Sequence, residues 1–593
     1  MIKIPEETKN LEKSAREDVS QENLRAHVEY FCSLGQKLAG NPEELKACNY
    51  IVSKLSEYGI EAQVYKFESY VSHPVQAEFE TFFPEKRSYE CLTPSFSLST
   101  PPSGLSADIV YVGDGREEDY KGRDVRGKIV LVDKVAGPQV TVAAVRNGAN
   151  GIISMSAGHV RHMMIVTPVW GTPSLDQKDN IPRIPVISIS GDDGKRLRSL
   201  AQAGTLRGTI KTELWEGWKT LHIPVAEIKG SKPEFLLVGG HYCSWFDGAT
   251  DNATGDSSLL ELSKLLKKYE NKLKRGVRLA WWPGHSHGRY SGSTWYADTF
   301  WQDLYDHCIV YFNIDSPGVK GATVYAPRHQ MAEVAEFNEG NVKELTDWSA
   351  VTSADVQLAH GRRKGKYTNA TRPSRAADQS FWGIGLTSIG VYSMLPPNHK
   401  DRREVGGSGG AWWWHSIDDT FDKADFAVLA QDTRLYLSSI LRLATMPILP
   451  FNFAMAAQDY LDALREYHEE AGDYVPLKPL MENTMILKEK AEVLDKKIAN
   501  LPEDDASADK TNRILLSLSR ILNPTLYTSV QPFDHQPALG TRFLPDIAPA
   551  LELKHMNPDS GEFKFLVTGL KRKINKVNFC VLKAIRTIDS WPD

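Results

Sequence analysis

The amino-acid sequence predicts an α/β fold that carries an inserted β-rich domain and a helical C-terminal region. Three observations support this prediction. Apolar runs typical of buried strands alternate with amphipathic helical segments before residue 100 and again from residue 221 to residue 435. Between these stretches, residues 101–220 contain short strands that glycine and proline separate. After residue 435 the apolar residues recur at helical spacing.

We therefore predict three domains. Residues 1–100 and 221–435 form the α/β catalytic domain, residues 101–220 form the insertion, and residues 436–593 form the helical domain. A chain of 593 residues is too long for a single hydrophobic core. The net charge of −5 gives no reason to expect a nucleic acid as partner.

The N-terminal segment begins with charged residues up to position 20, for which we expect a loose arm or a single helical turn. Val28, Phe31 and Leu34 then share one helical face. A second amphipathic helix runs from Leu45 to Tyr58, and residues 60–67 alternate like a half-buried strand. Helix followed by glycine and strand is typical of α/β domains.

The insertion reads as short strands at residues 107–113, 127–133, 151–155 and 184–190, with a short helix at 140–147. The C-terminal region reads as helices. An apolar stripe covers residues 487–501, a polar loop follows at 502–509, and further helices are expected at 514–522 and 571–588. These helices pack within the chain or supply a dimer surface, and the sequence does not decide between the two.

Polar residues follow the apolar runs of the second α/β stretch. Residues 235–240, 277–282 and 308–314 read as buried strands, and each run ends beside a metal-binding residue type. In an open α/β sheet the carboxyl ends of the strands meet at one edge. Imidazoles and carboxylates together suit zinc, iron, manganese or cobalt. The candidate segments contain His241 and Cys243, Asp251, His285 and His287, Asp315, and His415.

The six cysteines are scattered and form no CxxC pair, which is typical of an intracellular protein with free thiols. The first residues lack the apolar segment of a signal peptide. No apolar run reaches the length that a membrane span requires. We therefore expect a cytoplasmic protein without a membrane partner.

Five segments resemble, in order, the motifs of the M28 family of zinc aminopeptidases and carboxypeptidases. They are Gly240-His241, Gly248–Gly255 (GATDNATG), Asn313–Asp315, Ala377–Phe381 and His415–Lys423. Residues 101–220 resemble a protease-associated domain. The helical region, through Leu518–Pro524 and the Tyr, Pro and Phe residues that follow, resembles the dimerisation domain of glutamate carboxypeptidase II and the transferrin receptor. The resemblance implies an M28-type α/β sheet and a homodimer.

The resemblance also implies two metal ions that Asp251 bridges. His241 and Asp315 would complete the protein ligands of one ion, and His415 would bind the other. The cofactor would be one or two divalent ions, with zinc expected and iron or manganese as alternatives.

Two departures from the family pattern lie at this site. The family has a pair of glutamates, of which the first is the general base and the second is a metal ligand. Here His285 stands at the base position and Ser286 at the ligand position. His287 replaces the missing ligand if the loop shifts by one residue, or both histidines bind. Cys243 stands where the family has an aspartate that orients the histidine ligand, and its thiolate can itself bind a metal.

Aromatic residues flank these segments. Trp245, Trp282 and Trp414 either pack in the core or line a substrate pocket. Arg375 either lies in a solvated basic loop or grips a substrate carboxylate. We expect Asp378 to support the site rather than to bind a metal. Glycine-rich residues 406–410 are a flexible loop or a lid.

These observations predict a metal-dependent hydrolase of an amide or peptide bond, either exopeptidase-like or a specialised amidohydrolase. Its substrate would be a small molecule or a short peptide, and His285 would be the general base. One alternative is a single-metal deaminase or lyase that acts on a small aromatic substrate. Another is a non-catalytic binding scaffold like the transferrin receptor. Loss of the glutamate pair favours a scaffold, whereas the retained histidines and aspartates oppose it.

Overall fold

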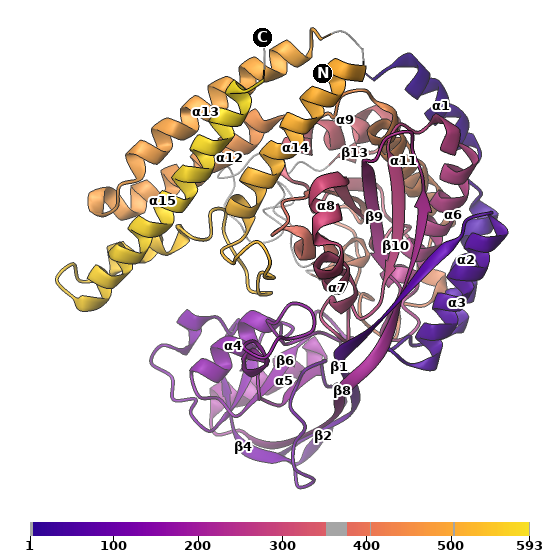
Figure 1. Cartoon of the computed structure of the whole chain (residues 1–593). Helices are drawn as coiled ribbons and strands as arrows, with labels where there is room; N and C mark the ends of the chain where they lie inside the picture. Colours follow the sequence, from indigo (N-terminus) through magenta and orange to yellow (C-terminus); the bar gives the residue numbers. More distant parts are fainter. Residues whose placement is uncertain (1–3, 351–375, 404, 502–504, 592–593) are drawn as a thin grey trace.

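The computed structural model of the chain describes residues 4–350, 376–403, 405–501 and 505–591. Figure 1 shows three parts: an α/β domain, an inserted domain below it, and a set of long C-terminal helices beside it. This arrangement confirms the predicted α/β fold with a β-rich insertion and a helical C-terminal region.

The centre of the α/β domain is a sheet with the strand order β14-β11-β9-β10-β8. The first four strands are parallel to one another, and β8 is antiparallel to β10. Their bounds are β9 (Phe235–His241), β10 (Gly276–Trp282), β11 (Cys308–Asn313) and β14 (Thr387–Ile389). Parallel pairing places the carboxyl ends of these strands, and the polar residues that follow them, at one edge of the sheet.

Helices cover both faces of this sheet because its strands are apolar on both sides. One face carries α1 (Glu6–Glu17), α2 (Gln21–Ser33), α3 (Pro42–Glu57), α6 (Thr254–Lys268), α9 (Ala335–Leu345) and α11 (Phe426–Thr445). The other face carries α7 (Ser291–Thr299) and α8 (Trp301–His307). A small second sheet contains β12 (Val324–Pro327), β13 (Ser349–Ala350) and β15 (Val391–Met394).

The expectation of a loose arm or a single turn before residue 20 was wrong, because α1 is a helix of 12 residues. Ala15 is buried in the core, and the Glu12 carboxylate forms a buried ion pair with Arg442 at 2.6 Å. Tertiary contacts therefore stabilise a helix that its charged sequence alone did not indicate.

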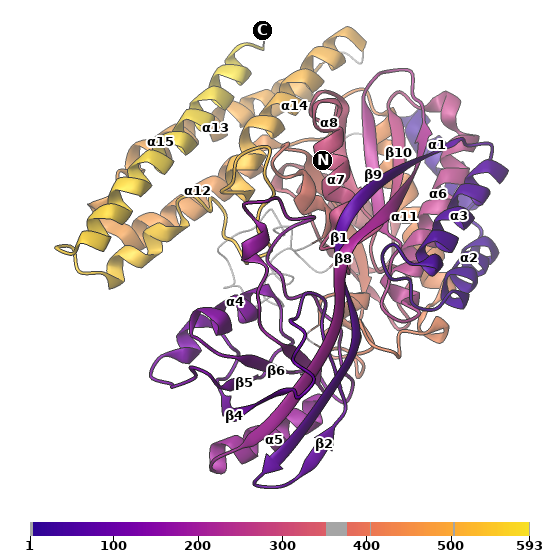
Figure 2. The same ribbon diagram turned by 60° about the horizontal axis from the view of Figure 1, so that its bottom comes forward.

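Two strands of 22 residues, β1 (Ala62–Phe83) and β8 (Arg207–Ile228), connect the α/β domain to the insertion (Figures 1 and 2). They pair antiparallel from Ala62 opposite Ala226 to Phe83 opposite Arg207, with irregular register after Pro74 and near the end of β1. The sequence predicted only a short strand at residues 60–67 and placed the insertion at residues 101–220. In the structure the two strands run through both domains, so the pairing continues across the junction.

The insertion is built on the outer ends of these two strands. It contains β2 (Arg87–Tyr89), β3 (Cys91–Leu92), β4 (Leu105–Tyr111), β5 (Ile129–Val132), β6 (Gly151–Met155) and β7 (Val186–Ile189). The helices α4 (Pro138–Arg146) and α5 (Gly191–Ala203) cover its strands. Its own core consists of two apolar clusters, one of which also contains Trp245 of the α/β domain.

The C-terminal helices are α12 (Phe453–Ala471), α13 (Leu477–Ile498), α14 (Asp505–Tyr527) and α15 (Gly561–Asp589). α14 begins at Asp505, inside the polar loop that the sequence predicted for residues 502–509. The guanidinium of Arg520 on α14 donates to the carbonyl oxygens of Tyr305 and Gly385, which fixes this region to the α/β domain. Within the described ranges, none of the helices combines the length and apolar character of a membrane span.

Candidate metal centre

Three side chains meet at the carboxyl edge of the sheet. His241 ends β9, Asp251 lies in the turn η3 (Ala249–Ala253) before α6, and Asp315 follows β11. His241 Nε2 lies 2.9 Å from Oδ1 of Asp251 and 3.8 Å from Oδ1 of Asp315. One ligand atom of each residue lies within 4.8 Å of the other two. The structure thus brings together the three residues that were expected to bind the first metal ion.

The backbone of the nearby residue Cys243 orients the His241 ring. Its Nδ1 lies 2.9 Å from the carbonyl oxygen of Cys243, so the ring donates from Nδ1 and presents Nε2 to the two aspartates. The Cys243 thiol is buried, and its sulfur also lies within 4.8 Å of a ring nitrogen of His241 and of His285. Cys243 therefore supports His241 through its backbone and also lies within reach as a sulfur ligand.

Asp419 supports the turn that carries Asp251. Its carboxylate accepts hydrogen bonds from the amides of Thr250 and Asp251, at 3.0 and 3.1 Å, and from the Thr250 hydroxyl at 2.7 Å. Burial raises the pKa of Asp419 to about 7. On the other side of the turn, the Asn252 amide donates to the carbonyl oxygen of His241 at 3.1 Å. These bonds fix Asp251 relative to β9.

His415 reaches the same aspartate from a different segment. Its Nε2 lies 2.9 Å from Oδ2 of Asp251, the oxygen that does not face His241. The Asp251 carboxylate therefore lies between two imidazoles, as a bridging carboxylate would. On its other side, His415 Nδ1 donates to the carbonyl oxygen of Met163 at 3.0 Å, and the Met163 amide donates to the carbonyl oxygen of His415 at 2.8 Å. A loop of the insertion thus orients a predicted metal ligand.

The pKa shifts at this centre reflect its charge pairs. Burial alone would lower the pKa of His241, but the contacts with Asp251 and Asp315 outweigh it and raise that pKa well above its ordinary value. Burial alone would raise the pKa of Asp251, but the two imidazoles outweigh it and lower that pKa well below its ordinary value. A carboxylate that stays charged in a buried place is suited to bind a cation.

The donor set fits a divalent ion. His241 Nε2 and Asp251 Oδ1 are both buried and, at 2.9 Å, still lack hydrogen-bond partners of acceptable geometry. Buried polar atoms normally have partners, and a cation between these two atoms would supply one. One imidazole and two carboxylates suit zinc, iron or manganese.

His285 stands beside this group. Its ring stacks on that of His241, with 3.7 Å between ring centroids and 2° between planes, and the Tyr290 ring meets it edge-on at 4.3 Å. Its Nδ1 lies 3.0 Å from the Ser286 hydroxyl oxygen. Burial, and then the nearby charge of His241, lower the pKa of His285 well below its ordinary value, so the ring is neutral.

His287 has a different environment. The Ala39 amide donates to its Nδ1 at 3.4 Å, and its ring meets those of His73 and Trp245 edge-to-face. It is fully buried, which lowers its pKa well below the ordinary value. Neither convergent ligand group found among the described residues contains His287. Of the two loop histidines, the structure brings His285 and not His287 to the metal ligands.

The predicted aromatic residues lie around His415 and the adjoining cavity. The Trp414 ring stacks on His415 with 3.6 Å between centroids, and Trp245 meets His415 edge-on at 4.5 Å. Trp282 lines the cavity and donates from Nε1 to the Tyr311 hydroxyl at 3.1 Å. Arg375 lies outside the described residues. The segment 406–410, predicted to be a loop or a lid, is largely packed, since Ser408, Gly409 and Gly410 are buried.

The cavity beside His241, His285 and Asp315 has a volume of about 10 Å³. This is about the space that one water molecule requires. Tyr290 also lines it and stacks on Trp170 of the insertion at 4.1 Å. A substrate larger than water therefore needs the lining side chains to move apart.

Asp378 is held by neighbours in the fold. Its Oδ1 lies 3.3 Å from Nδ1 of His329, and its Oδ2 accepts from the Trp382 indole at 3.1 Å. Neither contact involves one of the metal ligands, so the supporting role of Asp378 stays a prediction. Sequence reasoning missed Tyr290 and Met163, because Met163 acts through its backbone and Tyr290 adopts a left-handed conformation without glycine or asparagine to signal it.

Comparisons with known proteins agree with this architecture. Residues 225–439 match the model of peptidase family M28, and residues 101–197 match the PA domain. Carboxypeptidase Q of Mus musculus is 27% identical over 281 residues, which cover 44% of this chain and 58% of that protein. Aminopeptidase NAALADL1 of Rattus norvegicus is 27% identical over 550 residues, which cover 74% and 71% of the two chains. The chain thus spans little more than half the length of carboxypeptidase Q.

Solved structures with the same fold are zinc aminopeptidases and a related peptidase. A zinc aminopeptidase from Bacillus subtilis has a TM-score of 0.52 at 19% identity, covering 71% of this chain and 94% of that one. A peptidase M28 precursor from Shewanella amazonensis has a TM-score of 0.56 at 20% identity, covering 74% and 96%. At this identity the likeness shows the fold alone.

Proposed function

We propose that this chain, which carries a peptidase family M28 domain and a PA domain, is a metal-dependent hydrolase of an amide or peptide bond. One observation carries the proposal: His241, Asp251 and Asp315 converge within 4.8 Å at the carboxyl edge of the sheet. A scaffold that only binds a partner has no need of such a buried, charged group, whose assembly costs desolvation energy.

In this proposal His241, Asp251 and Asp315 hold one divalent ion, and zinc is the first candidate. When bound, such an ion polarises the substrate carbonyl and lowers the pKa of a water ligand. The Asp251 carboxylate is shared with His415, which would hold a second ion. Ser286 occupies the sequence position at which the M28 family has the glutamate ligand of that ion, so the second position is the weaker one.

His285 is the proposed general base. The Ser286 hydroxyl, 3.0 Å from Nδ1, fixes the orientation of the ring and leaves Nε2 to take a proton. Burial keeps the imidazole neutral, which is the form that accepts a proton. Nε2 would then return that proton to the departing amine. Asp419 takes no part in proton transfer here and holds the turn of Asp251.

The proposed substrates are short peptides or small amides. The relatives are named as a carboxypeptidase and an aminopeptidase, which supports an exopeptidase-like reaction. The lining of the cavity by Trp282 and Tyr290 is compatible with a substrate that carries an apolar or aromatic group. A second candidate is a single-metal deaminase or lyase on a small aromatic molecule, which the stacked Trp414 and edge-on Trp245 beside His415 favour.

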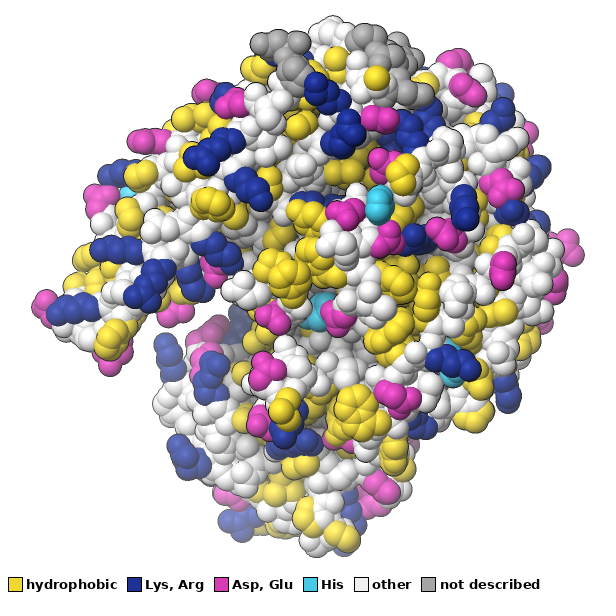
Figure 3. All heavy atoms as spheres, viewed as in Figure 1, with side chains coloured by type: hydrophobic (Ala, Val, Ile, Leu, Met, Phe, Trp, Pro, Cys, Tyr) yellow, Lys and Arg dark blue, Asp and Glu magenta, His cyan; other side chains and the backbone are white. Residues whose placement is uncertain are grey.

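We also propose that the chain is a cytoplasmic homodimer. α13 and α15 pack together and expose apolar side chains, among them Val493 at 51%, Phe565 at 80% and Phe579 at 64%. Exposed apolar groups of this size on adjacent helices are typical of an interaction surface. The cysteines are all unpaired, which supports a reducing compartment. Charges of both signs are mixed over the face in Figure 3, so no nucleic-acid partner is proposed.

The test begins with metal content. The full chain is purified without added metal, and zinc, iron and manganese are counted per chain by mass spectrometry. Hydrolysis of a panel of free and N-blocked dipeptides is then measured with and without added zinc. We expect about one tightly bound ion per chain, and release of an amino acid from at least one panel member. Absence of metal uptake together with absence of hydrolysis would leave the scaffold alternative.

A further inference from the structure

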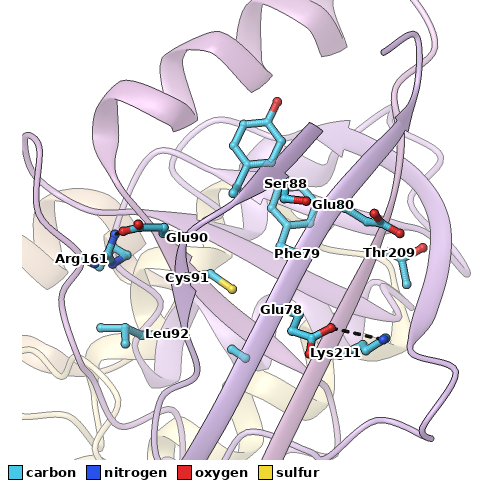
Figure 4. Close-up of a pocket in the computed structure, with 12 residues that line it drawn as sticks. Glu78, Phe79, Glu80, Ser88, Glu90, Cys91, Leu92, Arg161, Thr209 and Lys211 are labelled. Carbon is cyan, nitrogen blue, oxygen red and sulfur yellow. Dashed lines mark hydrogen bonds and ion pairs between the residues drawn. The ribbon is translucent and has the colours of Figure 1, made fainter. Parts of the chain in front are cut away.

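A second cavity lies in the insertion, away from the residues of the candidate metal centre. Its volume is about 750 Å³, and β1, β2, β8 and the loop at Arg161 line it (Figure 4). The proposed function makes no use of this groove. The groove contains acidic and basic side chains. The ion pairs that these side chains form, or lack, indicate which charged groups of a ligand the groove can bind.

The floor of the groove is a row of polar side chains across three strands. Glu80 of β1 lies opposite Ser88 of β2 and opposite Thr209 of β8. Directly opposed residues on neighbouring strands point to the same side of a sheet. A carboxylate and two hydroxyls therefore stand side by side, while the neighbouring pair Phe79 and Tyr89 stacks on the opposite side in the core.

The other charges of the groove have partners. Glu78 pairs with Lys211 across the strands at 3.2 Å, and Glu90 pairs with Arg161. Figure 4 shows these two pairs on opposite sides of the groove. In the described part of the chain, no ion pair is found for Glu80. The groove thus contains one carboxylate, that of Glu80, without a cationic partner. On the other side of the groove, the Arg161 guanidinium can exchange Glu90 for another carboxylate.

This arrangement matches a small zwitterion. An ammonium group has three N–H donors, which the Glu80 carboxylate and the hydroxyls of Ser88 and Thr209 can accept. A carboxylate at the other end can form a bidentate pair with Arg161 in exchange for Glu90, since surface ion pairs contribute little free energy. We propose that the groove binds a short zwitterionic ligand of the amino-acid or peptide class, with its amino group on Glu80 and its carboxylate on Arg161.

The same loop connects this groove with the metal centre. Arg161 lies two residues before Met163, whose amide and carbonyl both bond to His415. The following residue, Met164, accepts a hydrogen bond from Ser95 at 3.0 Å, so the loop is fixed on both sides. A ligand that moves Arg161 therefore changes the orientation of His415. This coupling rests on the proposed role of His415 as a metal ligand, whereas binding in the groove does not.

The test uses ω-amino acids, because they are zwitterions without an amide bond to hydrolyse. Binding of 4-aminobutyrate, 6-aminohexanoate and 8-aminooctanoate to the full-length protein is measured by isothermal titration calorimetry. We expect one member to bind best, and its Kd to rise roughly tenfold or more in both Glu80→Gln and Arg161→Ala, the effect of losing one charged partner. Glu213→Gln is the matched control, since this exposed residue lies on β8 beyond the groove. Its Kd should stay unchanged.

Hexylamine and hexanoate show which half of the ligand is recognised, and each should bind more weakly than 6-aminohexanoate. The proposal is overturned if no ω-amino acid binds, or if binding is unchanged in both groove variants. It is also overturned if binding is lost in Asp251→Ala, because the ligand then occupies the metal centre. Circular dichroism confirms that each variant is folded.

Coupling is read from the visible spectrum of the cobalt-loaded protein. The best ligand should change the cobalt absorption bands of the wild type and of Glu213→Gln but not of Arg161→Ala. Binding in the groove without any spectral change would refute the coupling and leave the binding site standing. Failure of cobalt to bind at all would instead count against the proposed function, since calorimetry of the groove requires no metal.

Discussion

The ligand group His241, Asp251 and Asp315 and the loop of residues 283–288 lie side by side but are held in different ways. Two of the three ligand residues sit at or just beyond the ends of parallel strands, and Asp419 fixes the third through its turn. The loop histidines are held mainly by ring contacts, through His241, Tyr290, His73 and Trp245. The sheet therefore determines the ligand positions, whereas ring packing determines the positions of the loop histidines.

The two regions therefore have different roles in the proposed function. In the proposed function, the charged residues at the strand ends would hold a cation and orient the substrate carbonyl. The loop would supply the side chain that takes the proton. Replacing residues in the first region should abolish metal binding, while replacing residues in the second should change rate or metal number.

The largest effect is expected for Asp251→Ala. The carboxylate lies between His241 and His415, so its loss removes a ligand from both metal positions. We expect metal content to fall to background and kcat/KM to fall by roughly 10³-fold or more. Asp247→Ala, in the same segment, is the control and should retain both. Normal metal content in Asp251→Ala would contradict the assignment of this residue.

The next effect separates the two loop histidines. His285→Gln should lower kcat by roughly 10²- to 10⁴-fold with metal content unchanged, because a positioned base is lost. His287→Gln should lower kcat by less than about tenfold, since His287 contacts His73, Trp245 and Ala39 rather than the ligand group. Steady-state kinetics and metal analysis of the two variants check this. Equal losses, or metal loss in His287→Gln, would show that His287 is the functional residue.

A smaller effect concerns the second metal position. Ser286→Glu restores a carboxylate at the position where the M28 family has its glutamate ligand, and we expect it to raise the affinity for a second zinc ion by roughly tenfold or more. Ser286→Gln is the matched control, because it has the same size without the charge. Zinc titration against a competing chelator measures both affinities. Identical titrations of wild type and Ser286→Glu would mean that no second ion can be held at this place.

The smallest effect is on the pH dependence of stability in the metal-free protein. Burial depresses the pKa of His287, so the stability of the folded state is complete above about pH 6.5 and is lost as pH falls toward the folded pKa. The aspartates raise the pKa of His241, so its contribution is complete below about pH 6.5 and is lost as pH rises through the folded pKa.

Thermal unfolding of His287→Gln should therefore depend less on pH between 5 and 7 than that of the wild type. His241→Gln should instead depend less on pH on the alkaline side. Unfolding temperatures measured in the presence of chelator test these opposite signs. If both variants change the pH dependence of the unfolding temperature in the same direction, the opposite pKa shifts assigned to His241 and His287 are wrong.

The sequence predicted those parts that depend on local pattern. The buried runs before His241 and Asp315 identified β9 and β11, and the rule for parallel strands placed both residues at one edge of the sheet. The residue pattern also included Asp251 and His415 among the candidates, and the resemblance to a known family added the bridging position of Asp251 and the assignment of His415 to a second ion. The α/β class, the β-rich insertion and the C-terminal helices followed from periodicity.

Other features depend on contacts between distant segments. α1 was missed because its stability comes from burial of Ala15 and the ion pair of Glu12 with Arg442, more than 400 residues away. The role of Met163 has no side-chain signal, since its backbone holds His415. The different environments of His285 and His287 were also undetermined, because they depend on ring contacts with distant segments, His241 for the first and His73 and Trp245 for the second.

The shared strands β1 and β8 have a consequence for how this molecule can be divided. Most modular insertions join their host through a pair of flexible linkers and can be cut out there. Here the pairing of β1 with β8 runs from Ala62–Ala226 to Phe83–Arg207, with two local shifts of register, and passes through both parts. A deletion of residues 84–206 would remove β2 and β4, which cover the outer edges of this strand pair, and would leave those edges with unpaired backbone amides and carbonyls, a template for aggregation. We therefore expect gene truncation at the family boundaries to give insoluble protein.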